Sequence, residues 1–330
     1  MTDFNYIKFC IEQASRGKKK RRSVQKVLNN IDYYAREIQN MVISHKIRFG
    51  KSHQWQIREY GKTRDITSSP FYPNHIIDYM IVNCLKEKIR KSLYAHVVGN
   101  IDKKGIKYGR DYLRSQCKNY THFVKLDIHH FYQSVSPRKL MGLLRKRIKD
   151  EDFLFIVEET ICRFDFLPIG AYYSQWLSNF YLMELDWIIK QELKIPLYIR
   201  YVDDMLLMGS KEQLSNLERI SEELEKLGLK LKKTPIVREF SKTPISFLGF
   251  RFFPQRTLLR REITRKIIKT CRSILRHCTS SLYHRFTSYW GWITSSDLIF
   301  SKIGGIIQSA RKIYEGNQTT APCVILRRVP

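Results

Sequence analysis

Two adjacent carboxylates, Asp203 and Asp204, stand inside an otherwise apolar stretch of the chain, residues 195–209. The apolar residues on either side predict two short strands that meet at these aspartates. An ionised carboxylate is costly in apolar surroundings unless it is paired or holds a cation, so a divalent metal is the expected partner. The alternative is an ordinary exposed turn, in which Asp is a common residue.

A third carboxylate, Asp127, occurs in a stretch with the same pattern. Residues 123–135 read as an apolar strand, then Asp127, then aromatic side chains. If the two strands are neighbours, Asp127 and Asp203 can share two magnesium ions, because Mg²⁺ typically takes one or two carboxylates and leaves its other positions to water and substrate phosphates. Asp204 is expected to be a supporting carboxylate.

Between these stretches, residues 167–186 read as a turn that runs into a strongly apolar helix. The three stretches, in this order and spacing, resemble the palm of a reverse transcriptase. The resemblance implies an α+β right-hand polymerase with fingers, a palm built on an antiparallel sheet, and a helical thumb. It places two Mg²⁺ ions, or alternatively Mn²⁺, on Asp127, Asp203 and Asp204, where they would support in-line nucleotidyl transfer.

Four residues are expected to bind the incoming nucleotide. Lys62 and Arg64 are two apart, so on a strand they project to the same side and suit a clamp on a triphosphate; a salt-bridged surface strand is the alternative. The resemblance decides for the clamp, because Lys-x-Arg-x-Ile before a helix looks like the fingers motif of bacterial reverse transcriptases. It also implies that Tyr132 crowds the sugar 2′ position and excludes ribonucleotides, rather than only packing in the core, and that Gln175 lies near the nucleotide.

Other residues are assigned to the template and primer. The family places a template-contacting loop at residues 99–109, and this chain matches it in part through Lys104 and Gly105. Gly170 and Ser174 lie at the start of the apolar helix, which in the family underlies the templating base. Ser174 can alternatively be no more than a helix cap.

The segment 169–175 departs from the pattern of most reverse transcriptases. Most members carry Gln-Gly-x-x-x-Ser-Pro here, whereas this chain reads Ile169-Gly-Ala-Tyr-Tyr-Ser-Gln175. This segment looks like the subtype found in diversity-generating retroelements, whose enzymes copy an RNA template with errors opposite adenine. Bacterial anti-phage reverse transcriptases are also close, so both roles are kept open.

Three further assignments concern the surroundings of the aspartates. Arg200 and Tyr201 precede them and are expected to face the primer terminus. Residues 245–253 read as an apolar hairpin that resembles the primer grip, with a simple core hairpin as the alternative. In the family a lysine near residues 229–233 can protonate pyrophosphate, and the choice is open among Lys230, Lys232 and Lys233.

The charge of the chain indicates a polyanionic partner. Lys and Arg number 59 against 31 Asp and Glu, a formal charge of +28, and such a field attracts nucleic acid. A basic helix over residues 260–276 is followed by an aromatic segment, residues 288–292. They resemble the thumb, which grips the template–primer duplex by its backbone, with a solvated helix face as the alternative. The cations assigned to this grip are Arg265, Lys269 and Arg272.

The composition, with 43% hydrophobic and 13% aromatic residues, predicts a chain that folds around substantial cores. Seven scattered cysteines without a Cys-x-x-Cys pair indicate neither a disulfide framework nor a zinc site. No apolar run is long enough to span a bilayer and the N-terminus does not resemble a signal peptide, so a cytoplasmic protein without a membrane partner is expected. The expected division is fingers with an N-terminal segment (1–120), palm (121–255), helical thumb (256–320) and tail (321–330).

The expected partners follow from the resemblance. They are an RNA template, a DNA or RNA primer, deoxynucleoside triphosphates, a noncoding RNA and an accessory protein. Two alternatives remain: a DNA polymerase that extends without a nucleic-acid template, and a catalytically idle RNA-binding scaffold of the same fold. Periodicity also predicts helices at 4–15, 24–46, 74–93, 110–119 and 211–227, and strands at 55–60 and from 229.

Overall fold

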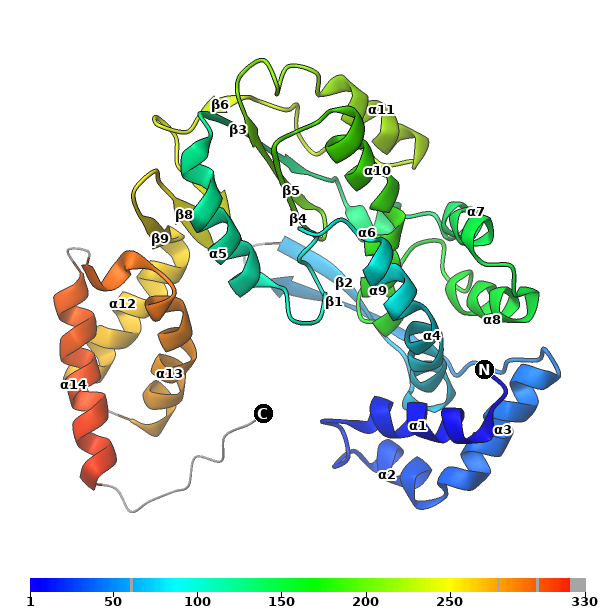
Figure 1. Cartoon of the computed structure of the whole chain (residues 1–330). Coiled ribbons are helices and arrows are strands. Elements are labelled where there is room, and N and C mark those ends of the chain that lie inside the picture. The colour runs from blue at the N-terminus through cyan, green and yellow to red at the C-terminus, as the bar shows by residue number, and fades with distance from the viewer. Residues whose placement is uncertain (60–61, 278, 301–302, 321–330) are drawn as a thin grey trace.

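The computed structural model describes residues 1–59, 62–277, 279–300 and 303–320, so the expected tail, 321–330, lies outside the described residues. The chain forms an arch, with a central sheet between an N-terminal group of helices and a C-terminal group of helices (Figure 1). No helix in the described part of the chain is both long and apolar enough to cross a membrane.

The N-terminal group begins with α1 (Phe4–Ser15), whose first turn is capped by Asp3 Oδ1, the acceptor for the Tyr6 backbone N–H at 2.6 Å. The predicted helix at 24–46 is wrong as a single element. Asn30 has non-helical backbone angles and separates α2 (Arg22–Asn29) from α3 (Ile31–Ile43). Asn favours such breaks because its side chain offers the backbone alternative hydrogen bonds.

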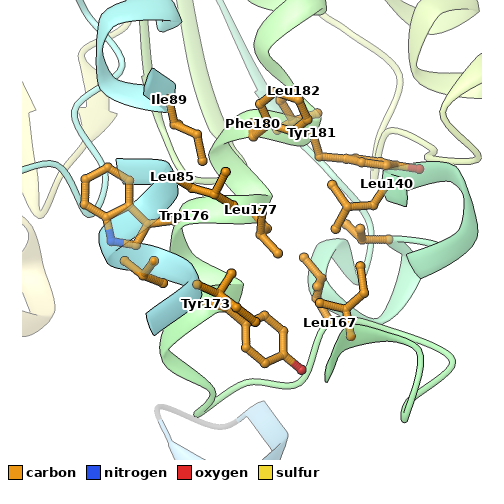
Figure 2. Packing of buried hydrophobic residues seen from close by; sticks show 14 of the residues in the cluster. Leu85, Ile89, Leu140, Leu167, Tyr173, Trp176, Leu177, Phe180, Tyr181 and Leu182 are labelled. Atoms are coloured by element: carbon orange, nitrogen blue, oxygen red, sulfur yellow. The ribbon is translucent and has the colours of Figure 1, made fainter. Parts of the chain in front are cut away.

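An antiparallel hairpin, β1 (His53–Glu59) with β2 (Lys62–Ser68), follows and pairs Ile57 with Arg64. Next come a short helical turn, η1 (Phe71–His75), and the long helix α4 (Ile76–Ser92). Apolar residues of α4 pack against α9 (Tyr172–Tyr181), where Leu85 and Ile89 face Trp176 and Leu177 (Figure 2). This contact joins the N-terminal helices to the central sheet.

The central sheet has the order β4-β5-β3-β6, with all neighbours antiparallel. Its strands are β3 (His122–Asp127), β4 (Leu197–Tyr201), β5 (Asp204–Gly209) and β6 (Arg238–Glu239). Strands β4 and β5 are almost wholly buried, so this part of the sheet is covered on both faces. The segments that connect these strands contain, besides α9, the following helices: α6 (Phe131–Ser134), α7 (Pro137–Arg147), α8 (Glu151–Ile161), α10 (Met183–Trp187), η3 (Ile188–Glu192) and α11 (Glu218–Lys226).

A second sheet, β7-β8-β9, lies between the central sheet and the C-terminal helices. Its first two strands form the predicted hairpin. The elements of this part are β7 (Ile245–Phe247), β8 (Phe250–Phe252), β9 (Thr257–Leu259), α12 (Arg261–Arg276), α13 (Ser280–Thr294), η4 (Asp297–Phe300) and α14 (Gly304–Thr320). Leu206 and Met208 of the central sheet share one apolar cluster with Phe247 and Ile267, so the second sheet joins the central sheet to the C-terminal helices.

Three predicted boundaries are corrected. Helix α5 runs from Ile106 to Gln116, with a further turn, η2 (Cys117–Asn119), and so starts inside the segment expected to be a loop. Of the helix expected at 211–227, only α11 forms, and residues 211–214 form turns next to a hydrogen bond from the Ser210 N–H to Gln213 Oε1 at 2.8 Å. The strand expected from 229 is a single bridge between Ile128 and Leu231.

Candidate active site

The strand pairing brings the predicted carboxylates together. Asp127, the last residue of β3, is paired in register with Asp204, the first residue of β5. Tyr201 of β4 is also paired with Asp204, which leaves Val202 and Asp203 as the two residues of the connection. We call these two residues the aspartate turn. Directly opposed residues of antiparallel strands project to the same face, so Asp127 and Asp204 stand side by side with Asp203 next to them.

The three carboxylates differ in their compensation by cations. Asp204 Oδ1 lies 3.0 Å from Lys125 Nζ, and Asp127 Oδ2 lies 3.4 Å from Lys232 Nζ. In the described part of the chain, Asp203 forms no salt bridge. Burial raises the pKa of Asp203 to about 6, and the nearby carboxylates of Asp204 and Asp127 act in the same direction. The site therefore concentrates negative charge that its own lysines compensate only in part.

A cavity of about 560 Å³ opens in front of these carboxylates. Of the predicted residues, it brings together Asp127, Asp203, Arg64, Tyr132, Tyr201 and Lys232. The rest of its lining is Thr63, Ile128, His129, His130, Phe131, Gln133, Ile169 and Val202. Cations and hydroxyls thus face the carboxylates across a space large enough for a small polar ligand.

The hairpin that carries Arg64 is held at the rim of this cavity by two hydrogen bonds. The Thr67 N–H donates to the Ile169 carbonyl at 2.8 Å, and Gln133 Nε2 donates to Asp65 Oδ2 at 3.3 Å. Arg64 is exposed and lines the cavity. Lys62 begins the same strand, two residues before Arg64, and its side chain lies outside the described part of the structure.

Tyr132, in the short helix α6, lies at the edge of the cavity and packs against the large apolar cluster. Burial raises the pKa of its phenol, so this side chain is a neutral ring at any ordinary pH. The prediction that Tyr132 crowds the sugar and the alternative that it packs in the core are both compatible with this position. Its role in nucleotide selection stays a prediction.

The start of α9 differs from the expectation for its polar residues. Gly170 has φ +118°, and a Cβ here would lie 2.2 Å from the Thr67 carbonyl, so glycine allows the hairpin to approach. Ala171 is the N-cap, and the buried Ser174 hydroxyl has no hydrogen-bond partner among the described residues, so the capping alternative is wrong. A direct contact of this hydroxyl with a template is not supported either. Gln175 is exposed but is not part of the cavity lining.

The loop assigned to the template is closed on itself. Lys104 Nζ donates to the Ala95 carbonyl at 2.6 Å, and the Gly105 N–H donates to the Val98 carbonyl at 2.9 Å. Gly105 occupies the N-cap position of α5. Neither Lys104 nor Gly105 lines the cavity, and their contact with a template stays a prediction.

The basic helix α12 has the face that was predicted for it. Arg265, Lys269 and Arg272 are exposed, whereas Ile267 and Cys271 are buried in the second apolar cluster. The cations thus point away from the core, and their contact with phosphates stays a prediction. Among the lysines left open for pyrophosphate, only Lys232 lines the cavity with Asp127 and Asp203.

The expectation that Arg200 faces the primer terminus is wrong. Arg200 is fully buried, and its Nη2 lies 2.6 Å from Oδ2 of Asp186, which is equally buried. Sequence reasoning missed Asp186 and the role of Asn179, whose Oδ1 accepts a hydrogen bond from Arg200 Nη1 at 3.0 Å. A signal was present, since Asp186 and Arg200 each stand in an apolar run and carry opposite charges.

A central antiparallel sheet with paired carboxylates, facing a cation-bearing hairpin across a cavity, is the arrangement of the right-hand polymerase class, and the predicted α+β fold is confirmed. Residues 18–252 match the family described as "Reverse transcriptase (RNA-dependent DNA polymerase)". The chain belongs to this family of RNA-directed DNA polymerases.

Two further comparisons were made. No curated protein matches the chain. Among solved structures, it is similar to apo telomerase from Candida Tropicalis truncated from its C-terminal domain, with 13% sequence identity and a TM-score of 0.48. The similarity covers 64% of this chain and 55% of the telomerase chain, so this chain spans little more than half of that protein.

Proposed function

We propose that this chain makes cDNA on an RNA template, adding deoxynucleotides by two-metal-ion nucleotidyl transfer. The observation that carries the proposal is the shared cavity, in which Asp127 and Asp203 face Arg64 and Tyr132. A scaffold that only binds RNA has no use for two crowded carboxylates beside a cation-lined cavity. The membership of residues 18–252 in the reverse transcriptase family supports the same function.

The carboxylates fit divalent cations. No group of three or more His, Cys, Asp or Glu in the described part of the chain is arranged as a complete protein cage for a metal. Mg²⁺ does not need one, because it is usually bound by one or two carboxylates together with water and substrate phosphates. Asp127 and Asp203 would hold the ions, with Asp204 as the supporting carboxylate. Burial raises the pKa of Asp203 and the carboxylates of Asp204 and Asp127 raise it further, and a bound cation would offset both effects.

When bound, the two ions would activate the primer 3′-hydroxyl and stabilise the leaving pyrophosphate. The residues of the chain do the remaining work. Arg64, and Lys62 on the same strand, bind the triphosphate from the hairpin side. Tyr132 limits the space beside the sugar, and Lys232 lies where it can neutralise or protonate the pyrophosphate. The exposed cations of α12 hold the template–primer duplex by its phosphates.

Primer extension tests the proposal. The purified chain is given an RNA template with an annealed primer, all four deoxynucleotides and Mg²⁺, and the products are sequenced. We expect cDNA complementary to the RNA, and no extension by Asp203→Asn, which should still bind the template–primer within a few-fold because the basic surface is intact. Retained extension in Asp203→Asn would contradict the site assignment.

The same assay separates the two alternatives. An enzyme that extends DNA without a template gives products unrelated to the RNA, and it does so when the RNA is left out. An idle scaffold binds RNA and gives no product with any nucleotide or metal. Extension that depends on the RNA and copies it excludes both alternatives.

We further propose that the enzyme works in a diversity-generating retroelement or in anti-phage defence, in the cytoplasm, with a noncoding RNA and an accessory protein as partners. The support is the segment 169–175, which resembles the enzymes of these systems. Sequencing the RNA and DNA that copurify with the protein tests this. Adenine-directed errors against a repeated gene segment indicate diversification, whereas a cDNA of a noncoding RNA indicates defence.

A further inference from the structure

The aspartate turn contains an unusual backbone conformation. Val202 has φ +58°. This left-handed region is disfavoured for a β-branched residue, because its side chain crowds the backbone. Such a conformation persists only where the surrounding structure determines it. The turn that places Asp203 must therefore be held by contacts from outside the turn itself.

The first contact comes from within the fold. Arg200 uses its guanidinium as a fork: Nε and Nη2 donate to the two oxygens of Asp186, at 2.7 and 2.6 Å. This leaves Nη1, which donates to the Val202 carbonyl at 2.9 Å. Both charged groups are fully buried, so neither can move away without leaving a charge unpaired.

Two neighbours form further hydrogen bonds with this pair. Tyr198 Oη donates to Asp186 Oδ1 at 2.6 Å, and Asn179 Oδ1 accepts from Arg200 Nη1 at 3.0 Å. All three nitrogens of the guanidinium thus have partners, which are Asn179 on α9, Asp186 on α10 and Val202 in the turn. The Val202 carbonyl is held by elements of the rigid core rather than by the loop around it.

The second contact of the turn is made by Gly99. A Cβ at Gly99 would lie 2.7 Å from the Val202 nitrogen and 2.8 Å from its Cγ2. The Gly99 carbonyl accepts a hydrogen bond from Asn179 Nδ2 at 2.8 Å, so the same asparagine serves both contacts. The segment before Gly99 is also fixed to β4, since the Val98 N–H donates to the Arg200 carbonyl at 2.9 Å.

We propose that Arg200 and Gly99 are positioning residues for the aspartate turn. Arg200 bonds to the Val202 carbonyl and Gly99 lies against the Val202 nitrogen, and these two contacts set where the Asp203 carboxylate lies relative to Asp127. The inference rests on the proposed function in one respect: misplacement of Asp203 lowers catalysis only if the site is catalytic. It also concerns divalent-cation binding, which can be measured without any reaction.

The first test inserts one methyl group beneath the turn. Gly99→Ala places a Cβ against the Val202 backbone, whereas Gly142→Ala, in α7, meets no atom within 4 Å and is the matched control. We expect kcat for deoxynucleotide incorporation to fall about 10- to 100-fold in Gly99→Ala, since small misplacements of reacting groups cost this much. KM for the nucleotide and the affinity for template–primer should stay within about threefold, because Arg64 and α12 are untouched. A kcat equal to that of Gly142→Ala would overturn the proposal.

The second test separates positioning from support of the fold. Arg200→Lys keeps a charge beside Asp186, but an ammonium lacks the planar fork needed to bond both carboxylate oxygens and the Val202 carbonyl. Tyr198→Phe removes a bond to the same aspartate without touching the turn. We expect a loss of kcat of about tenfold or more in Arg200→Lys and little change in Tyr198→Phe. Each kcat is corrected for the folded fraction of its variant, which urea unfolding measures. Equal kcat losses in the two variants would mean that the cluster only stabilises the fold.

The third measurement needs no catalysis. Binding of Mn²⁺, followed by electron paramagnetic resonance, is compared in the unmodified chain, Gly99→Ala and Gly142→Ala. We expect Gly99→Ala alone to bind Mn²⁺ about tenfold more weakly, because the two carboxylates no longer converge. Mn²⁺ binding without incorporation by the unmodified chain would overturn the proposed function and leave the inference standing. No difference between the two alanine variants would overturn the inference.

Discussion

Lys125 and Asp204 lie on neighbouring strands of the central sheet, with Nζ and Oδ1 3.0 Å apart. Lys232 lies 3.4 Å from Asp127 in the same way. These half-exposed pairs contribute little to stability, because solvent screens them. Their consequence is local: two of the three carboxylates have a cation beside them, and Asp203 has none among the described residues. The ionisation of Asp203 should therefore lower the free energy of unfolding of the metal-free protein.

The first prediction is that Asp203→Asn stabilises the metal-free protein at high pH. Burial raises the pKa of Asp203 to about 6, above its ordinary value near 4 in the unfolded chain. The unfolded chain therefore loses its proton first, and the penalty grows as pH rises from about 4 to about 6 and persists above. At about pH 8 in EDTA, the variant should gain on the order of 1 to 2 kcal/mol in urea unfolding.

At about pH 4 the same substitution should have little effect on stability, because the Asp203 carboxyl of the folded chain is then protonated and, like the Asn side chain, neutral. The control is Asp204→Asn, which removes a carboxylate paired with Lys125 and should bring no such gain. A stabilisation that is equal at both pH values would show that Asp203 titrates normally. Saturating Mg²⁺ should reduce the gain at high pH, since the cation favours the native carboxylate.

The second prediction concerns nucleotide selection. If the ring of Tyr132 limits the space beside the sugar, Tyr132→Ala should admit ribonucleotides, and the ratio of kcat/KM for deoxy- over ribonucleotides should fall about 10-fold or more. Tyr132→Phe keeps the ring and should keep the discrimination. Single-nucleotide incorporation with matched triphosphates gives both ratios. An unchanged ratio in Tyr132→Ala would assign the ring to packing alone.

The third prediction concerns the lysine beside Asp127. Lys232 lines the cavity, whereas Lys230 does not. Lys232→Met should lower kcat for incorporation about 10- to 100-fold, as expected for loss of a proton donor or a charge near the leaving group. Lys230→Met is the control and should change kcat less than about twofold. Pre-steady-state incorporation distinguishes them, and equal effects would mean that neither lysine acts on the leaving group.

The fourth prediction tests the exposed face of α12. Replacing Arg265, Lys269 and Arg272 together with Gln should weaken binding to all template–primer sequences alike, because phosphate contacts do not specify sequence. The slope of log binding constant against log salt should flatten by about two to three units, at roughly 0.7 to 0.9 per lost contact. The measurement is fluorescence anisotropy at several salt concentrations, after circular dichroism has shown the variant folded.

A charge-matched control uses three exposed lysines on α4 and α7, Lys88, Lys91 and Lys146, replaced with Gln. This variant loses the same net charge, so it measures the effect of the general field of the chain. Its salt slope should change by less than about one unit. A slope that is unchanged in the α12 variant would mean that this helix faces away from the duplex.

The carboxylates of the site were predictable because local sequence patterns indicate them. Asp127 ends one apolar strand and Asp203 follows another, and a strand end is where a carboxylate can be both fixed and accessible. Helices such as α1 and α12 were predictable for a similar reason, since their apolar spacing is regular. The hairpin β7–β8 also appeared where its alternation indicated.

Other features depended on contacts between distant parts of the chain. Arg200 looked available for the primer, but the buried carboxylate of Asp186 neutralises it, and nothing in a strand of five residues shows which way its fourth residue points. Ser174 was assigned to the template, and the packing around α9 buries it.

The sequence by itself determined the kind of chemistry, the basic character of the binding surface and the order of the main elements, because residue type and periodicity act over a few residues. Tertiary structure alone decided which groups meet. It paired Asp127 with Asp204 across two strands, brought Lys232 to the lining of the cavity, and brought Gly99 and Arg200 into contact with the aspartate turn. These relations join residues far apart in the chain, and only the folded core brings their atoms within bonding distance.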